Sequence, residues 1–167
     1  MHDVIACNKR SVKKVAFAGF KKALIGKKFS SVKREGKYLI IYLRSSDKKV
    51  VMHFGLTGFL VYTKDKEEEV RFSKVTFLFA DGSVLHWCDI RKFGAIWLVK
   101  QLDEIKGLEK IGPDPLAISK KDFLALLAQS KKKNIKSFLM DQSIIAGIGN
   151  EYSDEILFQS KINPHHS

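Results

Sequence analysis

The chain has 167 residues, enough for one domain of ordinary size or for a larger domain with a small companion. Hydrophobic residues make up 45% of it, and no apolar run approaches the roughly 18 residues of a membrane helix, which excludes a disordered chain and a spanning segment. Lys and Arg number 30 against 18 Asp and Glu, and a net charge of +12 favours a polyanionic partner, most commonly nucleic acid. A basic surface that serves only solubility is the alternative.

The first part of the chain has the pattern of a β-rich domain. Val4–Cys7 is a short apolar run that can form a strand, and Lys13–Leu24 has the spacing of an amphipathic helix that ends at Gly26. Seven further strand-like segments follow at short intervals: Lys27–Lys33, Tyr38–Leu43, Val50–Phe54, Phe59–Thr63, Lys74–Phe79, Val84–Cys88 and Ala95–Val99. Short strands separated by Gly-, Asp- and Ser-containing turns predict a β-sandwich or barrel.

The pattern changes after Val99. The segment Ile111–Pro115 carries two of the three prolines, which restrict the backbone and suit a linker. Lys120–Ala128 follows with helical spacing and with Ser119 as its N-cap. Strands first and helices second predict an α+β chain of two modules, a β-sandwich over residues 1–110 and a helical module over residues 111–167.

The stretch from Lys131 to Tyr152 organises the helical module. Apolar residues recur there at helical spacing and can bury one face, while four lysines stay on the other face; the apolar residues are Ile135, Phe138 and Leu139, and the lysines are Lys131, Lys132, Lys133 and Lys136. The pattern predicts a short basic helix before a double turn.

Two glycines then interrupt the helical pattern. Gly147 and Gly149 allow a sharp turn and a close approach of the backbone, and Asn150 is expected to be the N-cap of a helix that runs to about Ser160. A helix N-terminus beside lysines is a phosphate site. An ordinary helical hairpin with a solvated basic face fits the same spacing.

Three motifs of the strand-rich part combine cations with apolar side chains. Lys37 follows a tight turn, Leu56 lies in a bend between two glycines, and Arg91 and Phe93 share one loop. Each alone also suits a solvated lysine or a core residue. Together they supply apolar wedges for a base stack and cations for the backbone beside it, as a protein that distorts DNA requires.

These motifs resemble the formamidopyrimidine-DNA glycosylase and endonuclease VIII (Fpg/Nei) family. The resemblance rests on five segments in the family's order: Gly36–Leu39, His53–Gly58, Asp89–Gly94, Gly112–Pro115 and Ile135–Tyr152. It implies a β-sandwich, a helix–two-turn–helix module and damaged double-stranded DNA as the partner. It also implies base-excision repair by a DNA glycosylase and AP lyase, which flips out an oxidised base, cuts its glycosidic bond and cleaves the strand by β-elimination.

The resemblance assigns roles to particular residues. Lys37 and Asn150 match residues that grip DNA phosphate, and Arg91 matches the arginine that fills the space of the flipped base. Phe93 matches the aromatic wedge, and Leu56 stands where many members have methionine. Lys136 matches a lysine of the helical module and is expected to contact the polyanion.

The sequence departs from the family at both ends. Members begin, once Met is removed, with proline and glutamate, whose terminal amine forms a Schiff base; here Met1 is followed by His2 and Asp3, so no catalytic residue is identified and the family's opening helix is expected to be missing. The family's zinc hairpin is not expected in this sequence, and His165 and His166 without further ligands are poor evidence for a metal site. No metal or other cofactor is therefore expected.

The remaining expectations concern setting. Cys7 and Cys88 lack metal-ligand spacing, which favours a reducing compartment, and the chain is expected to be a cytoplasmic monomer without membrane contact, associated with the nucleoid if bacterial. Without the Pro-Glu pair, the leading expectation is a protein of the glycosylase and AP lyase type that binds DNA and has feeble or absent catalysis. A non-catalytic DNA-binding module and a decayed fragment of such an enzyme are the alternatives. The lesion is left open.

Overall fold

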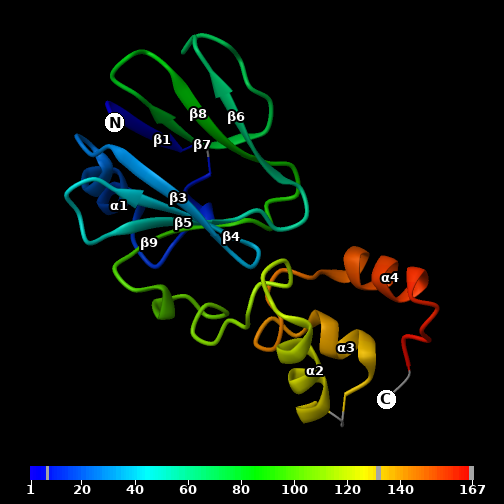
Figure 1. The fold of residues 1–167 in the computed structure, drawn as a ribbon. Coiled ribbons are helices and arrows are strands. Elements are labelled where there is room, and N and C mark those ends of the chain that lie inside the picture. Colours follow the sequence, from blue (N-terminus) through cyan, green and yellow to red (C-terminus); the bar gives the residue numbers. More distant parts are fainter. Residues whose placement is uncertain (7, 131–132, 166–167) are drawn as a thin grey trace. The chain divides into compact units, whose positions relative to one another are not determined.

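The computed structural model describes residues 1–6, 8–130 and 133–165, and these form two compact units. The first unit comprises Met1–Arg34 and Tyr38–Gln101, and the second comprises Glu35–Lys37 and Leu102–Ser167 (Figure 1). The tip of one hairpin of the strand-rich part therefore belongs to the second unit. Within the described part of the chain, no helix is long and apolar enough to span a membrane.

The first unit is built from two sheets. One sheet has the antiparallel order β1 (Asp3–Ala6), β7 (Ser73–Leu78), β8 (Val84–Asp89) and β6 (Gly58–Thr63). The other has the order β2 (Val12–Lys13), β9 (Ala95–Val99), β5 (Lys49–His53), β4 (Tyr38–Leu43) and β3 (Phe29–Glu35), in which β2 runs parallel to β9. A short 3-10 helix, η1 (Lys9–Ser11), precedes β2.

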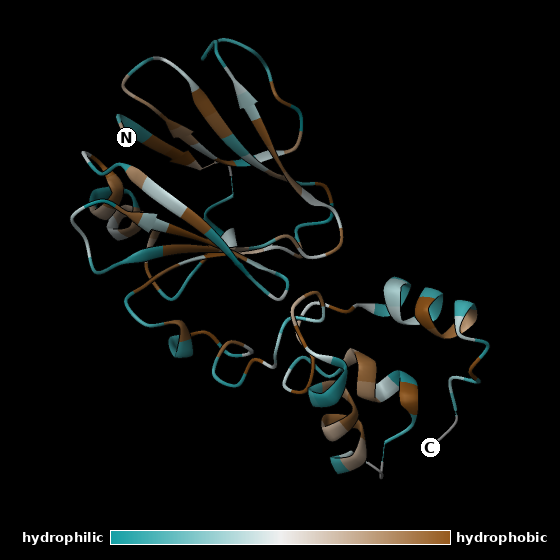
Figure 2. Cartoon of the chain, in the orientation of Figure 1, coloured by the Kyte–Doolittle hydropathy of each residue, from teal (hydrophilic) through white to brown (hydrophobic). Residues whose placement is uncertain are grey.

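Side chains of both sheets share one core. Phe77 and Trp87 from the first sheet meet Met52 and Ile96 from the second, and all four are fully buried. Hydrophobic residues run along the strands of both sheets (Figure 2). Burial of each such side chain contributes roughly 1.5–3 kcal/mol, so this shared core is what holds the two sheets together. The predicted sandwich is confirmed.

The strand predictions are confirmed within two residues at every bound that falls on a described residue. The largest displacement is at β3, which begins at Phe29 instead of Lys27. The predicted strand Val4–Cys7 corresponds to β1, although Cys7 lies outside the described residues. The bounds were predictable because turn residues separate the short apolar runs that form the strands.

The predicted helix Lys13–Leu24 is wrong in its first four residues. Helix α1 spans Phe17–Leu24, and Lys13 instead pairs with β9 as part of β2. Lys14 adopts a left-handed φ of 67° and Ala16 is extended, so the backbone turns before the helix begins. The helical spacing predicted the buried face correctly, since Phe20 and Leu24 are both fully buried.

The second unit is helical. It contains the 3-10 helix η2 (Leu102–Glu104), α2 (Lys120–Gln129), α3 (Ile135–Met140) and α4 (Asn150–Gln159). Its core is formed by side chains from α3, α4 and the turn between them: Phe138, Leu139, Ile145, Ile148 and Leu157. The predicted N-cap of α2 is confirmed, because Ser119 Oγ accepts a hydrogen bond from the Asp122 backbone N–H at 3.1 Å. The predicted basic helix includes Lys131 and Lys132, which lie outside the described residues.

Candidate nucleic-acid interface

Lys37 lies against the turn that leads into α4. Its Nζ and Cε are 3.3 and 3.6 Å from the position that a Cβ on Gly149 would occupy. Because Gly149 has no side chain, the ammonium group can come this close to the backbone at the start of the helix. Burial lowers the pKa of Lys37, although the residue as a whole is exposed.

Gly36 sets the position of this lysine. Its φ is +54°, and an added Cβ would meet Ile111 Cδ1 at 3.0 Å and Ala146 Cβ at 3.3 Å. Any larger residue would be strained and would push the turn away from its neighbours. The conformation of Gly36 and Lys37 is thus set by contacts with residues of the second unit that are distant in sequence, Ile111 and Ala146.

The N-cap of helix α4 lies one residue before the predicted position. Gly149, in extended conformation, is the N-cap, so Asn150 is the first helical residue and the expectation that Asn150 caps the helix is wrong. The Gly149 carbonyl accepts the Ser153 N–H at 2.9 Å, while no side chain among the described residues caps the first turn. The N–H groups of that turn are therefore at the end of the helix where Lys37 lies, and Asn150, the first helical residue, is exposed there.

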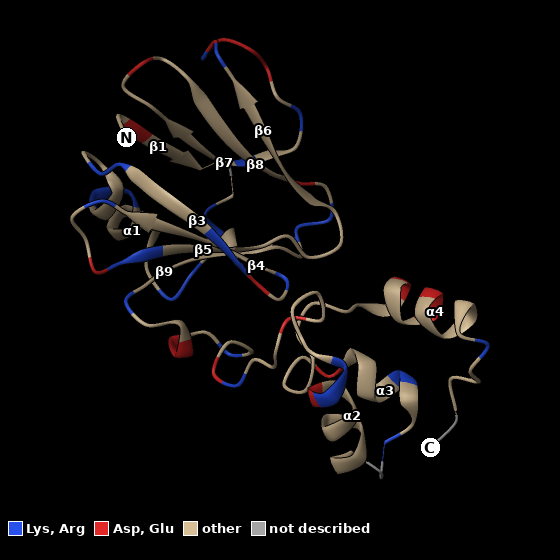
Figure 3. Cartoon of the chain, in the orientation of Figure 1, with Lys and Arg blue, Asp and Glu red and all other residues tan. Residues whose placement is uncertain are grey.

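The charge balance at this end favours an anion. A helix N-terminus carries about half a positive charge, and Lys37 adds a full one. Glu151 in the first turn of α4 opposes them in part. Lys and Arg residues are spread over both units (Figure 3), so the location of this site follows from its geometry rather than from net charge alone.

The turn before α4 is held by Gln142, which sequence reasoning assigned no role. Its Nε2 donates to the carbonyls of Met140 at 2.9 Å and Ile148 at 2.8 Å, and its Oε1 accepts the Gly147 N–H at 2.8 Å. Gly147 has a φ of 104°, which confirms the predicted sharp turn. The signal that could have identified Gln142 was its place inside the recognised Met140-Asp141-Gln142 motif.

Asp141 stabilises the other side of the same turn. Its Oδ1 accepts the Ser143 N–H at 2.9 Å and the Ser143 hydroxyl at 2.5 Å, and its Oδ2 pairs with the Lys133 ammonium group. The bond from Lys133 and those from Ser143 lower the pKa of Asp141 to about 2. Lys133 is thereby paired within the turn.

Lys136 forms an ion pair within the second unit. Its Nζ lies 2.6 Å from Asp154 Oδ1, and the lysine side chain is only 30% exposed. The pair joins α3 to α4 inside the second unit. The predicted contact of Lys136 with a polyanion stays a prediction.

Leu56, Arg91 and Phe93, the three residues expected to enter the base stack, come from two loops that touch within the first unit. Leu56 lies in the loop between β5 and β6, and the other two lie in the loop between β8 and β9. Leu56 is 72% exposed and Phe93 58% exposed, so neither is the core residue that each could also have been. The Arg91 guanidinium lies over the Phe93 ring, 4.8 Å from its centre. A Cβ on Gly55 would meet the backbone of Phe93 at 2.8 Å, which shows how closely the loops pack.

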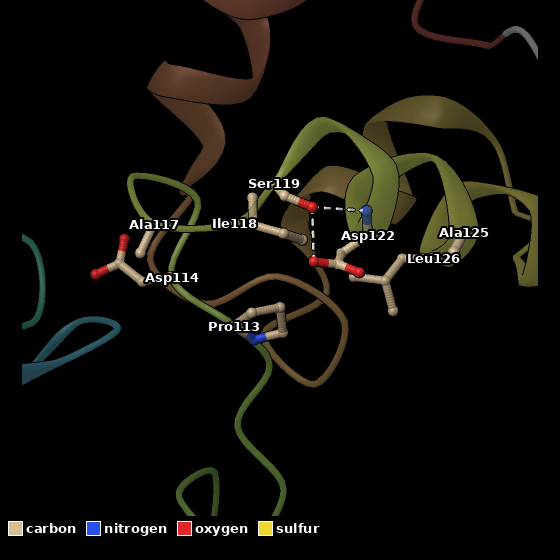
Figure 4. A pocket seen from close by; sticks show the side chains of 8 residues that line it. All are labelled: Pro113, Asp114, Ala117, Ile118, Ser119, Asp122, Ala125 and Leu126. Atoms are coloured by element: carbon tan, nitrogen blue, oxygen red, sulfur yellow. Dashed lines mark hydrogen bonds between the residues drawn. The ribbon is translucent and has the colours of Figure 1, made fainter.

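A separate pocket of about 510 Å³ lies in the second unit, beside the start of α2. It is lined by Pro113, Asp114, Ala117, Ile118, Ser119, Asp122, Ala125 and Leu126 (Figure 4). Ser119 and Asp122 are bonded to each other there as the helix cap, at 2.6 Å between Oγ and Oδ2. None of the predicted site residues lines it.

The described residues hold no group of three or more His, Cys, Asp or Glu side chains that could bind a metal ion. Cys88 is a buried free thiol, and burial raises its pKa. Cys7 and His166 lie outside the described residues.

Two family models match the chain. That of the formamidopyrimidine-DNA glycosylase N-terminal domain matches residues 1–96, and that of the formamidopyrimidine-DNA glycosylase H2TH domain matches residues 111–167. A two-sheet domain and a helix–two-turn–helix domain in this order define the class of the protein. The chain belongs to the formamidopyrimidine-DNA glycosylase family.

Similar proteins support this assignment over most of the chain. A formamidopyrimidine-DNA glycosylase of Pelotomaculum thermopropionicum is 40% identical over 148 residues, which cover 87% of this chain and 53% of that protein. One of Bacillus cereus is 36% identical over 168 residues, covering 98% and 60%. The chain thus spans between half and two thirds of the length of these relatives.

Solved structures show the same fold. The Lactococcus lactis enzyme non-covalently bound to DNA with an AP site has a TM-score of 0.85 and 31% identity, covering 100% of this chain and 64% of that one. The same enzyme in complex with DNA containing FAPY-dG has a TM-score of 0.86 and 29% identity, covering 100% and 63%.

Proposed function

We propose that this chain acts in base-excision repair and binds damaged double-stranded DNA, as part of a DNA glycosylase and AP lyase for oxidised bases. The observation that carries the proposal is the position of the Lys37 ammonium group beside Gly149, at the N-terminus of α4. Family membership and the DNA complexes of the Lactococcus lactis relative support the same partner.

The phosphate contact follows from the chemistry of this site. The Lys37 ammonium group is a compact cation, and the open N–H groups of α4 are fixed donors. A phosphate oxygen that accepts from both neutralises the cation that burial makes costly to keep charged. The net charge of +12 adds the long-range attraction that brings a duplex to the surface.

The wedge loops supply the distortion. Exposed Leu56 and Phe93 gain by entering a base stack, since each would otherwise leave its apolar surface in water. Arg91, stacked on Phe93, brings a cation and planar donors to the same place. We propose that these three side chains occupy the space of an everted or missing base.

The chemical step requires an amine that attacks the sugar carbon and forms an imine. No residue of this chain is assigned that role. Borohydride treatment after incubation with duplex that carries 8-oxoguanine or an abasic site reports directly whether an amine of this chain forms the imine, because only the imine is reduced to a stable adduct. We further propose that the protein acts as a cytoplasmic monomer, at the nucleoid in a bacterium.

Binding can be tested apart from chemistry. Fluorescence anisotropy compares a duplex that contains a tetrahydrofuran abasic analogue with the same duplex undamaged. We expect tighter binding to the damaged duplex and at least about a fivefold loss for Lys37→Ala, since one phosphate contact is worth about 1 kcal/mol or more. Lys121→Ala, which removes an exposed lysine of α2, is the matched control. Equal loss for both lysines, or none for Lys37→Ala, contradicts the proposal.

A further inference from the structure

Asp89, at the end of β8, lies fully buried beneath the two wedge loops. Its Oδ2 accepts the Gly94 N–H at 2.7 Å, and its Oδ1 accepts the Thr57 hydroxyl at 2.8 Å and the Arg91 N–H at 3.2 Å. One carboxylate therefore bonds to both loops that carry Leu56, Arg91 and Phe93.

Thr57 completes the connection between the loops. While its hydroxyl donates to Asp89, its Oγ1 accepts the Arg91 N–H at 3.0 Å. The Arg91 N–H is thus shared between the hydroxyl and the carboxylate. Thr57 follows Leu56 in the chain, so its bonds to Asp89 and Arg91 tie the loop of Leu56 to the loop of Arg91 and Phe93.

The carboxylate is suited to remain charged in this position. Burial acts to raise the pKa of Asp89, but hydrogen bonds from Gly94, Thr57, Lys92 and Arg91 more than offset it, and the pKa lies below its ordinary value. A buried anion attracts N–H donors more strongly than a neutral group would. The loop backbones are therefore held by charge-assisted bonds.

The packing leaves the loops little alternative. Gly55 has a φ of +59°, and any Cβ there would lie 2.8 Å from the backbone of Gly94 and of Phe93. Gly55 N–H also donates to His53 Nδ1 at 3.1 Å. A rigid, bonded base beneath exposed apolar side chains is unlike a surface loop that only connects two strands.

We propose that Asp89 and Thr57 are positioning residues that preset the wedge, holding Leu56, Arg91 and Phe93 in one arrangement before DNA arrives. The proposal rests on the proposed function, since it concerns the same wedge. A preset wedge enters a damaged stack without first ordering its loops, so the ordering cost is not taken from the binding free energy. Neither residue has to touch DNA.

The test uses the full chain with three variants of the positioning residues, and with Phe93→Ala alone and combined with one of them. Thr57→Val removes the hydroxyl and keeps the shape, Thr57→Ser keeps the hydroxyl, and Asp89→Asn replaces an acceptor by a donor that faces N–H groups. Urea unfolding first establishes that each variant is folded at the assay temperature. The DNA carries 2-aminopurine next to a tetrahydrofuran abasic analogue, and its fluorescence rises when the wedge unstacks it.

We expect saturating parent and Thr57→Ser to give the full fluorescence rise, and Thr57→Val and Asp89→Asn to lose most of it. Their preference for damaged over undamaged duplex should fall on the order of tenfold, with binding to undamaged duplex changed less than twofold. Phe93→Ala combined with Thr57→Val should lose little beyond Phe93→Ala alone, because both act through one wedge.

Three results would overturn the inference. If Thr57→Val keeps the parent's fluorescence rise and preference, the bond does not position the wedge. If Thr57→Val loses binding to both duplexes equally, its role is only to support the fold. If the parent itself shows neither fluorescence rise nor preference, the proposed function fails and this inference fails with it.

Discussion

Removing the charge of Asp141 should weaken the turn that presents α4. The carboxylate accepts two bonds from Ser143 and pairs with Lys133, and these interactions lower its pKa to about 2. Asp141→Asn keeps an oxygen for the Ser143 N–H but cannot form the ion pair. The variant therefore isolates the contribution of charge to the turn.

The structure sets the size of the effect. A pKa that falls from 3.8 to about 2 corresponds to roughly 2.4 kcal/mol at neutral pH, at about 1.36 kcal/mol for each pH unit. The Lys133 side chain is 43% exposed, so solvent screens the pair and we expect about 1–2 kcal/mol. Because the folded pKa is the lower one, this stability is present above about pH 4 and is lost as the pH falls toward 2.

Hydrogen exchange of the α3 and α4 amides, followed by mass spectrometry, measures the free energy of opening of these helices. At pH 7 the amides of Asp141→Asn should open about 1–2 kcal/mol more easily than those of the parent, and the difference should shrink toward pH 2. Glu109→Gln, which removes an exposed carboxylate of the same unit, should change the opening free energy by less than about 0.5 kcal/mol. A difference below about 0.3 kcal/mol at pH 7, or one that does not depend on pH, would refute the reasoning.

Three further changes test the fold. Ser119→Ala should reduce the free energy of opening of α2 by about 1 kcal/mol in the same exchange experiment, because the cap bond is lost. Gly36→Ala should lower the stability of the second unit, measured by urea unfolding, by about 1–2 kcal/mol, since its φ is positive and Ile111 Cδ1 lies 3.0 Å from the new Cβ. The control Gly19→Ala within α1, where nothing lies within 4 Å of the new Cβ, should be neutral or stabilising. Burial lowers the pKa of His86, so the unfolded chain takes up a proton at higher pH than the folded chain does. The stability of the first unit should therefore fall as the pH drops below about 6.5. Tryptophan fluorescence follows its urea unfolding, and an unfolding midpoint that is the same at pH 7.5 and 5.5 would contradict this.

The strands were predictable because turn residues separate short runs of apolar and β-branched residues along the chain. Each apolar run between turn residues corresponds to a strand, from Tyr38–Leu43 to Ala95–Val99. The start of α1 was not predictable, because nothing in the sequence indicates the left-handed conformation of Lys14, the residue after β2. Amphipathic spacing reports which residues are buried, but it does not report where the backbone turns.

The candidate site was predictable only as a set of residue types. The resemblance selected Lys37 and Asn150, but the approach of Lys37 to Gly149 depends on how the hairpin tip packs in the second unit. The sequence also gave no sign that Lys136 pairs with Asp154, since any lysine of that helix could face solvent. The predicted domain division after residue 110 and the roles of the wedge residues stay predictions.

The salt dependence of DNA binding tests the central claim most directly. The affinity for a duplex with an abasic analogue is measured for the parent, Lys37→Ala and Lys121→Ala over a series of salt concentrations. We predict that the plot of log affinity against log salt loses about one unit of slope in Lys37→Ala and keeps the parent slope in Lys121→Ala, because of these two lysines only Lys37 is proposed to contact a DNA phosphate and release a counterion. An unchanged slope for Lys37→Ala would show that the site at the start of α4 does not bind the DNA backbone.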